Sequence, residues 1–200
     1  PSRTPAADDS STLSLTAATR ALAPIPSAER DLPTAVAEPY FKVADGQVAL
    51  EGPAFDRQGN LLFVDVYGSR ILRLTPQRQL STIYTEPNLH PAGIAIHKDG
   101  RIFVASVGPV NAQGHFDAGS VIALLPDGRG RQVIVPPSAG YVVDDLVFDR
   151  EGGFYFTDFR GNSTQAVGGL FYVTPDFKTI KPVLPHMCAA NGVALSPDDK

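Results

Sequence analysis

The sequence predicts an all-β protein of the β-propeller type, mainly because it repeats itself. Four segments align without gaps, each with a small or polar start, an apolar middle and a turn rich in Gly or Asp. They begin at Glu51, Ala92, Asp144 and Asn191, which are separated by 41, 52 and 47 residues. Repeats of roughly 40–50 residues, each holding four short strands, are typical of propeller blades.

Each of the first three repeats continues into three further apolar segments, so that each supplies four strands. We expect second strands at 61–66, 102–107 and 154–159, third strands at 70–74, 120–125 and 169–173, and fourth strands at 81–84, 131–135 and 178–183. A β-sandwich would not repeat in units of four strands, and a solenoid would have a shorter period.

The fourth repeat supplies only its opening strand, at 191–195, before Lys200. The sequence thus holds about three and a half blades, whereas a closed propeller typically needs 4–8. We expect residues 37–200 to be the N-terminal portion of a larger propeller domain. Residues 1–36 are rich in Ser, Thr, Ala and Pro and are expected to form a flexible arm, with at most a short helix around 11–22.

Composition excludes several functions. The 200 residues are 43% apolar, which is enough for one globular core, and 18 Gly with 18 Pro indicate many turns. A net charge of −4 argues against a nucleic-acid partner, and no apolar run is long enough to cross a membrane. Cys188 is the single cysteine and no signal peptide is recognisable, so we expect a cytoplasmic protein without an internal disulfide.

The first position of each repeat predicts a metal site. In a propeller the first strands of the blades line a central channel, so Glu51, Asp144 and Asn191 should point toward one axis. Carboxylates that converge there repel one another and are costly to desolvate, and a hard cation removes that cost. Two carboxylates and an amide suit Ca²⁺ or Mg²⁺. Alternatively, each residue caps its own strand through a backbone amide. Asp145 should point the other way and be structural.

A second set of equivalent residues, Asp65, Ser106 and Asp158, lies at the ends of the second strands. We expect these side chains to bond within or between blades rather than to act in catalysis. The four histidines (His90, His97, His115 and His186) lack the spacing of metal ligands. Motifs for a serine nucleophile, a phosphate loop or a dinucleotide are absent from the sequence. An insertion in the second repeat, residues 108–119, is expected to be a solvated loop that can reach one rim of the channel.

From about residue 38 onward, the sequence resembles the SMP-30/gluconolactonase/LRE family of six-bladed propellers. The resemblance rests on Leu50-Glu-Gly, Phe55-Asp-Arg-Gln-Gly, Asp144-Asp-Leu-Val-Phe-Asp and Ala190-Asn-Gly-Val-Ala-Leu-Ser. It implies a Ca²⁺-dependent hydrolase that opens lactone rings, for which other divalent cations would also be suitable.

The resemblance places the ligands of the catalytic metal at Glu51, Asp144 and Asn191, in agreement with the repeat positions. The family's fourth ligand, an aspartate that is also its general acid/base, has no counterpart here and is expected beyond Lys200. The catalytic residue is therefore unknown within this chain.

A second, structural calcium site of the family would fall on Asp117, Gly119 and Tyr141. Pro136 and Ala139 replace two of its side-chain oxygen donors, so we expect binding there to be weaker than in the family.

The function expected is hydrolysis of a small-molecule lactone, with neither nucleic acid nor membrane as partner. Two alternatives remain open at this point. One is a non-catalytic, calcium-stabilised propeller that binds a partner. The other is a phosphotriesterase-like hydrolase with a similar axial Ca²⁺.

Overall fold

The structure is a computed structural model that describes residues 27–33 and 35–198. The chain divides into two units, residues 1–42 and 43–200. In the first unit, the described residues contain one turn of 3-10 helix, η2 (Ser27–Glu29). The helix expected around 11–22 lies outside the described residues, as does most of the arm.

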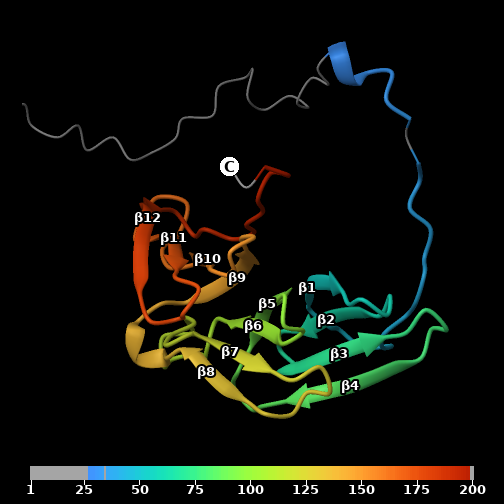
Figure 1. The fold of residues 1–200 in the computed structure, drawn as a ribbon, viewed down its shortest axis with the longest axis horizontal. Helices are drawn as coiled ribbons and strands as arrows, with labels where there is room; N and C mark the ends of the chain where they lie inside the picture. Colours follow the sequence, from blue (N-terminus) through green and yellow to red (C-terminus); the bar gives the residue numbers. More distant parts are fainter. Residues whose placement is uncertain (1–26, 34, 199–200) are drawn as a thin grey trace, which may run out of the picture. The chain divides into compact units, whose positions relative to one another are not determined.

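The second unit contains three four-stranded antiparallel sheets, each formed by four strands consecutive in sequence (Figure 1). The first sheet has β1 (Leu50–Phe55), β2 (Leu61–Asp65), β3 (Arg70–Leu74) and β4 (Leu80–Thr85). The second has β5 (Pro91–Ile96), β6 (Ile102–Ser106), β7 (Ser120–Leu124) and β8 (Gln132–Val135). The third has β9 (Val143–Phe148), β10 (Phe154–Asp158), β11 (Gly168–Val173) and β12 (Ile180–Met187). The repeat of four strands predicted from the sequence is confirmed.

The largest difference from the expected strand bounds is at β12, which extends four residues past the predicted end at residue 183. It contains Pro182 and Pro185, which cannot donate a backbone hydrogen bond. β12 is the edge strand of its sheet and pairs with β11 through two bulges, so both prolines are accommodated.

Residues 191–195, predicted to open a fourth blade, form no β-strand. A strand requires a neighbour that shares its backbone hydrogen bonds. In this segment the N–H of Val193 instead donates to the carboxylate of Asp145, at 2.9 Å. The segment is held beside the third sheet by a side chain.

The hydrophobic core lies between the stacked sheets, and the middle sheet is buried on both faces. Along β6, Ile102 and Val104 pack with the first sheet, whereas Phe103 and Ala105 pack with the third. Side chains alternate along a strand, so every residue of β6 is buried. This two-sided burial explains why β6 and β7 are almost continuously apolar.

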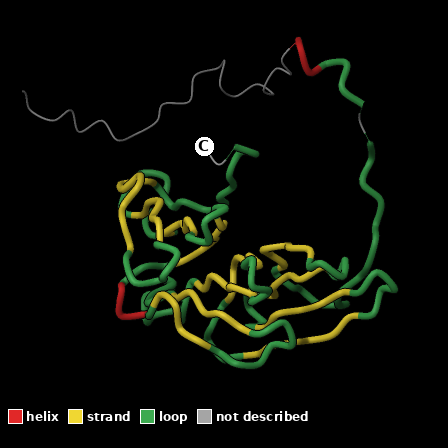
Figure 2. The backbone as a smooth tube through the Cα atoms, viewed as in Figure 1, coloured by secondary structure: helices red, strands yellow, loops and turns green. Residues whose placement is uncertain are grey.

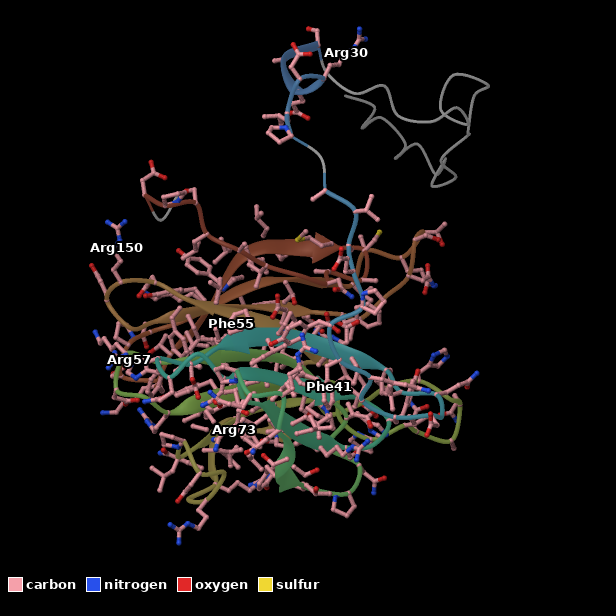
Figure 3. All side chains as sticks on the ribbon, turned by 90° about the vertical axis from the view of Figure 1, so that its right-hand side faces the viewer. Arg30, Phe41, Phe55, Arg57, Arg73 and Arg150 are labelled. Atoms are coloured by element: carbon pink, nitrogen blue, oxygen red, sulfur yellow. The ribbon has the colours of Figure 1, made fainter. Side chains whose placement is uncertain are left out.

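Aromatic rings fill the space between the second and third sheets. The rings of Phe103 and Phe148 meet edge to face with their centroids 4.9 Å apart, and Phe154 lies against both. Loops and turns join the strands (Figure 2), and polar and charged side chains such as Arg57 extend from the surface (Figure 3). Among the described residues, none of the helices has the length and apolar character that a membrane span requires.

Candidate metal centre

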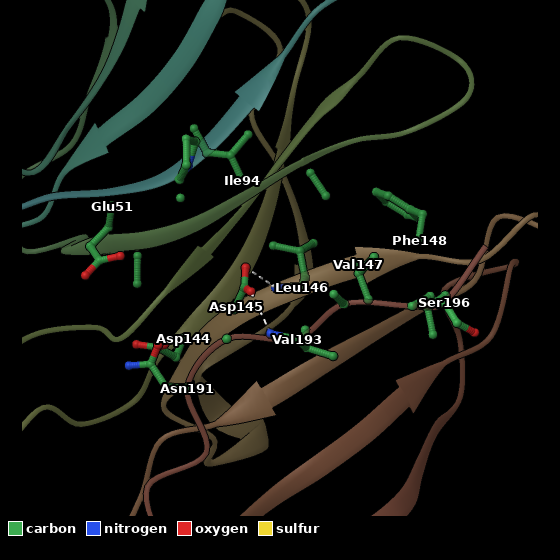
Figure 4. A pocket seen from close by; sticks show the side chains of 17 residues that line it. Glu51, Ile94, Asp144, Asp145, Leu146, Val147, Phe148, Asn191, Val193 and Ser196 are labelled. Atoms are coloured by element: carbon green, nitrogen blue, oxygen red, sulfur yellow. Dashed lines mark hydrogen bonds between the residues drawn. The ribbon is translucent and has the colours of Figure 1, made fainter. Parts of the chain in front are cut away.

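The structure brings Glu51, Asp144 and Asn191 together in the lining of one cavity of about 560 Å³ (Figure 4). Glu51 lies on β1, Asp144 lies on β9, and Asn191 follows β12. Ala92, the equivalent residue of the second repeat, lines the same cavity without a polar side chain. The same three polar residues also line a smaller cavity of about 190 Å³.

Glycine at the next repeat position allows the first strands of the sheets to approach closely. A Cβ atom on Gly52 would lie 2.7 Å from the carbonyl oxygen of Ala92, and one on Gly93 would lie 2.6 Å from Oδ1 of Asp145. Gly52 also has a positive φ of 56°, which L side chains rarely adopt. These contacts set how closely β1, β5 and β9 pack, and hence how near Glu51 comes to Asp144.

The electrostatics of the cavity favour a bound cation. Burial, followed by the negative charges of Asp145 and Glu51, raises the pKa of Asp144 to about 6. Within the described residues, no hydrogen bond reaches the side chains of Glu51, Asp144 or Asn191, and the dashed bonds in Figure 4 end on Asp145. Capping of a backbone amide, the alternative role for these residues, therefore has no support among the described residues.

The donor set fits a hard cation of the Ca²⁺ or Mg²⁺ type, which prefers oxygen ligands. Two carboxylates would balance a charge of +2, and the amide oxygen of Asn191 would add a neutral donor. Among the described residues, no cluster of three or more His, Cys, Asp or Glu side chains is placed to hold a metal. From the described residues, a cation here would therefore have two carboxylates, Glu51 and Asp144, with the amide of Asn191 as the third protein donor.

Asp145 has a structural role, as predicted, but its expected orientation away from Asp144 does not keep it out of the site, because both residues line the 560 Å³ cavity. Its Oδ2 accepts the N–H of Val193 at 2.9 Å and its Oδ1 accepts the N–H of Leu146 at 2.8 Å. Its own N–H donates to Oγ1 of Thr157, and that hydroxyl donates to the carbonyl oxygen of Asn191 at 2.5 Å. Asp145 and Thr157 therefore fix the backbone on both sides of Gly192.

The sequence did not single out Thr157. A signal was nevertheless present in the repeat. Thr157 directly precedes Asp158 at the end of the second strand, and the residues at the same position in the first two repeats are Val64 and Ala105. Only this repeat carries a hydroxyl there.

The second set of equivalent residues is also structural, as predicted. Buried Asp65 pairs with Arg70 at 2.9 Å, and Asp158, which has no exposed surface, is bonded by Arg160 through Nε and Nη2. Ser106 donates its hydroxyl to the carbonyl of Leu89.

Two of the residues predicted to bind a second cation, Gly119 and Tyr141, lie side by side. A Cβ on Gly119 would be 3.0 Å from the carbonyl oxygen of Tyr141, so these two backbones are adjacent. Asp117 follows Phe116 in the insertion, and its N–H donates to the carbonyl of Pro109 at 2.9 Å. Pro136 precedes the one-turn helix η3 (Pro137–Ala139). Occupation of this site stays a prediction.

Phe116 is a residue of the candidate site that the sequence reasoning missed. It lies in the 108–119 insertion, where it forms an isolated bridge with Val110, and it lines the smaller cavity with Glu51, Asp144 and Asn191. The insertion therefore reaches this cavity, as expected. The available signal was the one aromatic residue of the insertion outside its histidine.

Three consecutive four-stranded sheets, stacked with their first strands facing a shared polar cavity, define a β-propeller. Residues 50–200 match the family described as SMP-30/Gluconolactonase/LRE-like region, and the chain belongs to this family.

Curated relatives agree with this assignment. The chain is 45% identical over 181 residues to lactonase drp35 of Staphylococcus saprophyticus, covering 90% of this chain and 54% of that protein. It is 42% identical over 174 residues to lactonase drp35 of Staphylococcus aureus, covering 86% and 52%. The chain thus spans about half the length of the curated relatives it matches.

Solved structures share the fold. A gluconolactonase from Xanthomonas campestris superimposes with a TM-score of 0.62 at 22% identity, over 78% of this chain and 53% of that one. At these identities the likeness shows the propeller fold alone.

Proposed function

We propose that this chain forms part of a calcium-dependent hydrolase that opens lactone rings. The observation that carries the proposal is the meeting of Glu51, Asp144 and Asn191 in one cavity, with their side chains free of hydrogen bonds from the described residues. The drp35 relatives, at 45% and 42% identity, are named lactonases, which supports the same reaction class.

The residues of this chain would hold the cation and shape the space beside it. A bound Ca²⁺ supplies a Lewis acid that polarises the ester carbonyl. Glu51 and Asp144 would contribute its negative ligands, and Asn191 would contribute its amide oxygen from a backbone that Thr157 holds through the main-chain carbonyl. The smaller cavity also has apolar walls, from Val66, Val107, Phe116 and Phe159. These walls would receive the carbon skeleton of the ring and limit the access of water.

The proton-transfer group is not assigned to a described residue. The carboxylates that line the larger cavity are Glu51, Asp144 and Asp145. The first two are the proposed ligands, and both oxygens of Asp145 already accept backbone hydrogen bonds. The aspartate that the family resemblance implies has no counterpart in this sequence, so we place the proton transfer on a residue outside it.

The proposal is tested by calorimetric titration with CaCl₂ and by lactone hydrolysis with and without a chelator, both on the full-length protein. Glu51→Gln and Asp144→Asn should each weaken calcium binding at least tenfold and reduce turnover, because each removes a charged ligand. Asp127→Asn is the matched control, since it alters an exposed carboxylate in the turn after β7. Unchanged calcium affinity in both ligand variants would overturn the site.

The assay also separates the two alternatives. Calcium-dependent turnover of aryl phosphotriesters without lactone hydrolysis would favour a phosphotriesterase. Calcium binding without turnover of either substrate would favour a non-catalytic propeller.

We also propose a cytoplasmic location. Cys188 is the single cysteine, and its side chain is exposed and free. A reducing compartment keeps such a thiol unmodified.

A further inference from the structure

A second large cavity lies beside the candidate metal centre. It has a volume of about 480 Å³ and is lined mainly by two loops, the 108–119 insertion between β6 and β7 and the loop between β10 and β11. Its lining includes Val142, Val167, Arg160 and Gln165. Both loops belong to described residues of the second and third sheets.

Two phenylalanines join this cavity to the metal centre. Phe116 and Phe159 line both the 480 Å³ cavity and the smaller cavity that contains Glu51, Asp144 and Asn191. Both rings pack on a buried apolar cluster of Ala92, Val107 and Val142. A molecule held at the metal centre can therefore extend past an aromatic wall into the second cavity.

Hydrogen bonds hold the two loops in shape. Oδ1 of Asn111 accepts the backbone N–H groups of Gln113 and His115, both at 3.0 Å. In the other loop, Nδ2 of Asn162 donates to Oε1 of Gln165 at 2.9 Å. The cavity is therefore formed before any ligand enters it, which lowers the entropic cost of binding.

Two of the polar residues that line the cavity, Arg160 and Gln165, offer donors. The bonds of Arg160 to Asp158 use Nε and Nη2, and its guanidinium lies 5.8 Å from the centre of the Tyr141 ring. Because Gln165 receives the Asn162 hydrogen bond on Oε1, its Nε2 group can donate. Asp158 balances the positive charge of Arg160, so the pair favours a neutral acceptor over an anion.

We propose that this cavity is the subsite for a substituent of the lactone, and that Phe116 and Phe159 determine specificity for it. The inference rests on the proposed function. The substrate class is a lactone ring carrying a flexible apolar arm whose far end bears a neutral hydrogen-bond acceptor, such as a carbonyl or amide oxygen. The ring lies at Glu51, Asp144 and Asn191, the arm passes Phe116 and Phe159, and the acceptor meets Arg160 and Gln165.

The test uses γ-lactams, which keep the ring shape of a γ-lactone but resist hydrolysis, so binding is measured without turnover. Calorimetry on the full-length protein compares the unsubstituted lactam with lactams bearing straight alkyl arms of increasing length. Affinity should rise by about fourfold for each buried methylene until the cavity is filled. Phe116→Ala should reduce the gain in affinity that each methylene brings. Phe55→Ala changes an exposed phenylalanine of β1 and should leave that gain unchanged.

A second variant protects the test against misfolding of Phe116→Ala. Val167 lines the cavity yet is 57% exposed, so Val167→Trp fills the outer space without disturbing the core. It should weaken binding of long arms and leave the unsubstituted lactam unaffected. Equal affinity for all arm lengths in the wild-type protein, or an unchanged series in both variants, would overturn the subsite.

The far end of the arm is tested with a lactam whose arm ends in a carboxamide instead of a methyl group. Its affinity relative to that of the methyl-terminated lactam measures the preference for a carboxamide. Gln165→Leu should lower the preference for the carboxamide about threefold or more, and Gln79→Leu, in the turn before β4, should not. The same preference in Gln165→Leu as in the wild type would refute the acceptor part of the proposal. Lactam binding that follows arm length while no lactone is hydrolysed would retain the subsite and refute the proposed reaction.

Discussion

The carboxylate of Asp145 accepts a hydrogen bond from the backbone N–H of Val193 at 2.9 Å, across 48 positions of sequence. This bond ties the first strand of the third sheet to the segment that carries Asn191. Asp145 stands where the other three repeats have glycine, at Gly52, Gly93 and Gly192. The one repeat that departs from glycine therefore supplies the side chain that aligns the proposed amide ligand.

Replacement of Asp145 by asparagine should weaken calcium binding although Asp145 is not a proposed ligand. An amide can accept only one of the two backbone N–H groups, from Leu146 and Val193, that the carboxylate accepts now. Loss of a group that orients a ligand typically reduces metal affinity by about 10–100-fold. Calorimetric titration with CaCl₂ would measure this loss, and an affinity equal to that of the wild type would show that Asn191 is positioned independently.

The stability of the metal-free protein should depend on pH through Asp144. Its pKa is raised from 3.8 to about 6 in the folded state, first by burial and then by Asp145 and Glu51. Between about pH 4 and pH 6 the folded protein holds a proton that the unfolded chain has released. The free energy of unfolding should therefore fall as the pH rises through this window.

Urea unfolding of chelated protein at several pH values between 4 and 7 would measure this effect. Asp144→Asn should show a smaller decline than the wild type, because its amide does not titrate. Parallel pH profiles for the two proteins would contradict the raised pKa.

Two Asp–Arg pairs with the same spacing should differ strongly in their effect on stability. Arg160→Met leaves Asp158 without its ionic partner, and Asp158 has no exposed surface. The side chain of Arg160 is 43% exposed, but its loss leaves a buried carboxylate without a partner, which should cost up to about 3 kcal/mol of unfolding free energy. Arg129→Met removes the partner of Asp127, and both side chains are exposed, so no measurable loss is expected. Equal losses in the two variants, measured by urea unfolding, would contradict this account.

Gly52→Ala should destabilise the protein and weaken calcium binding together. The new Cβ would lie 2.7 Å from the carbonyl oxygen of Ala92, at a residue with positive φ. Overpacking of this kind typically costs about 1–3 kcal/mol, and relief of the contact would move the adjacent Glu51. Gly46→Ala is the matched control, because no atom lies within 4 Å of its added Cβ. Thermal unfolding and calcium titration of both variants would test this, and a wild-type result for Gly52→Ala would refute the close approach.

The sequence by itself determined the repeat, the four strands of each unit and the positions of Glu51, Asp144 and Asn191 at equivalent places. These features follow from local patterns, because strand alternation and turn residues are legible within a few positions. It also predicted a structural role for Asp145, although the expected alternation of side chains along the strand does not keep this residue out of the cavity that Asp144 lines.

Only the tertiary structure decided which groups those side chains contact. That residues 191–195 bond to Asp145 rather than form a strand depends on how this segment lies against the third sheet. The entry of Phe116 into the metal centre depends on the path of an insertion that has no equivalent in the other repeats. Contacts between residues far apart in sequence depend on how whole sheets stack, and no pattern within a few positions of the sequence encodes that stacking. The repeat therefore located the candidate ligands, and the stacking of the sheets supplied the cavity that surrounds them.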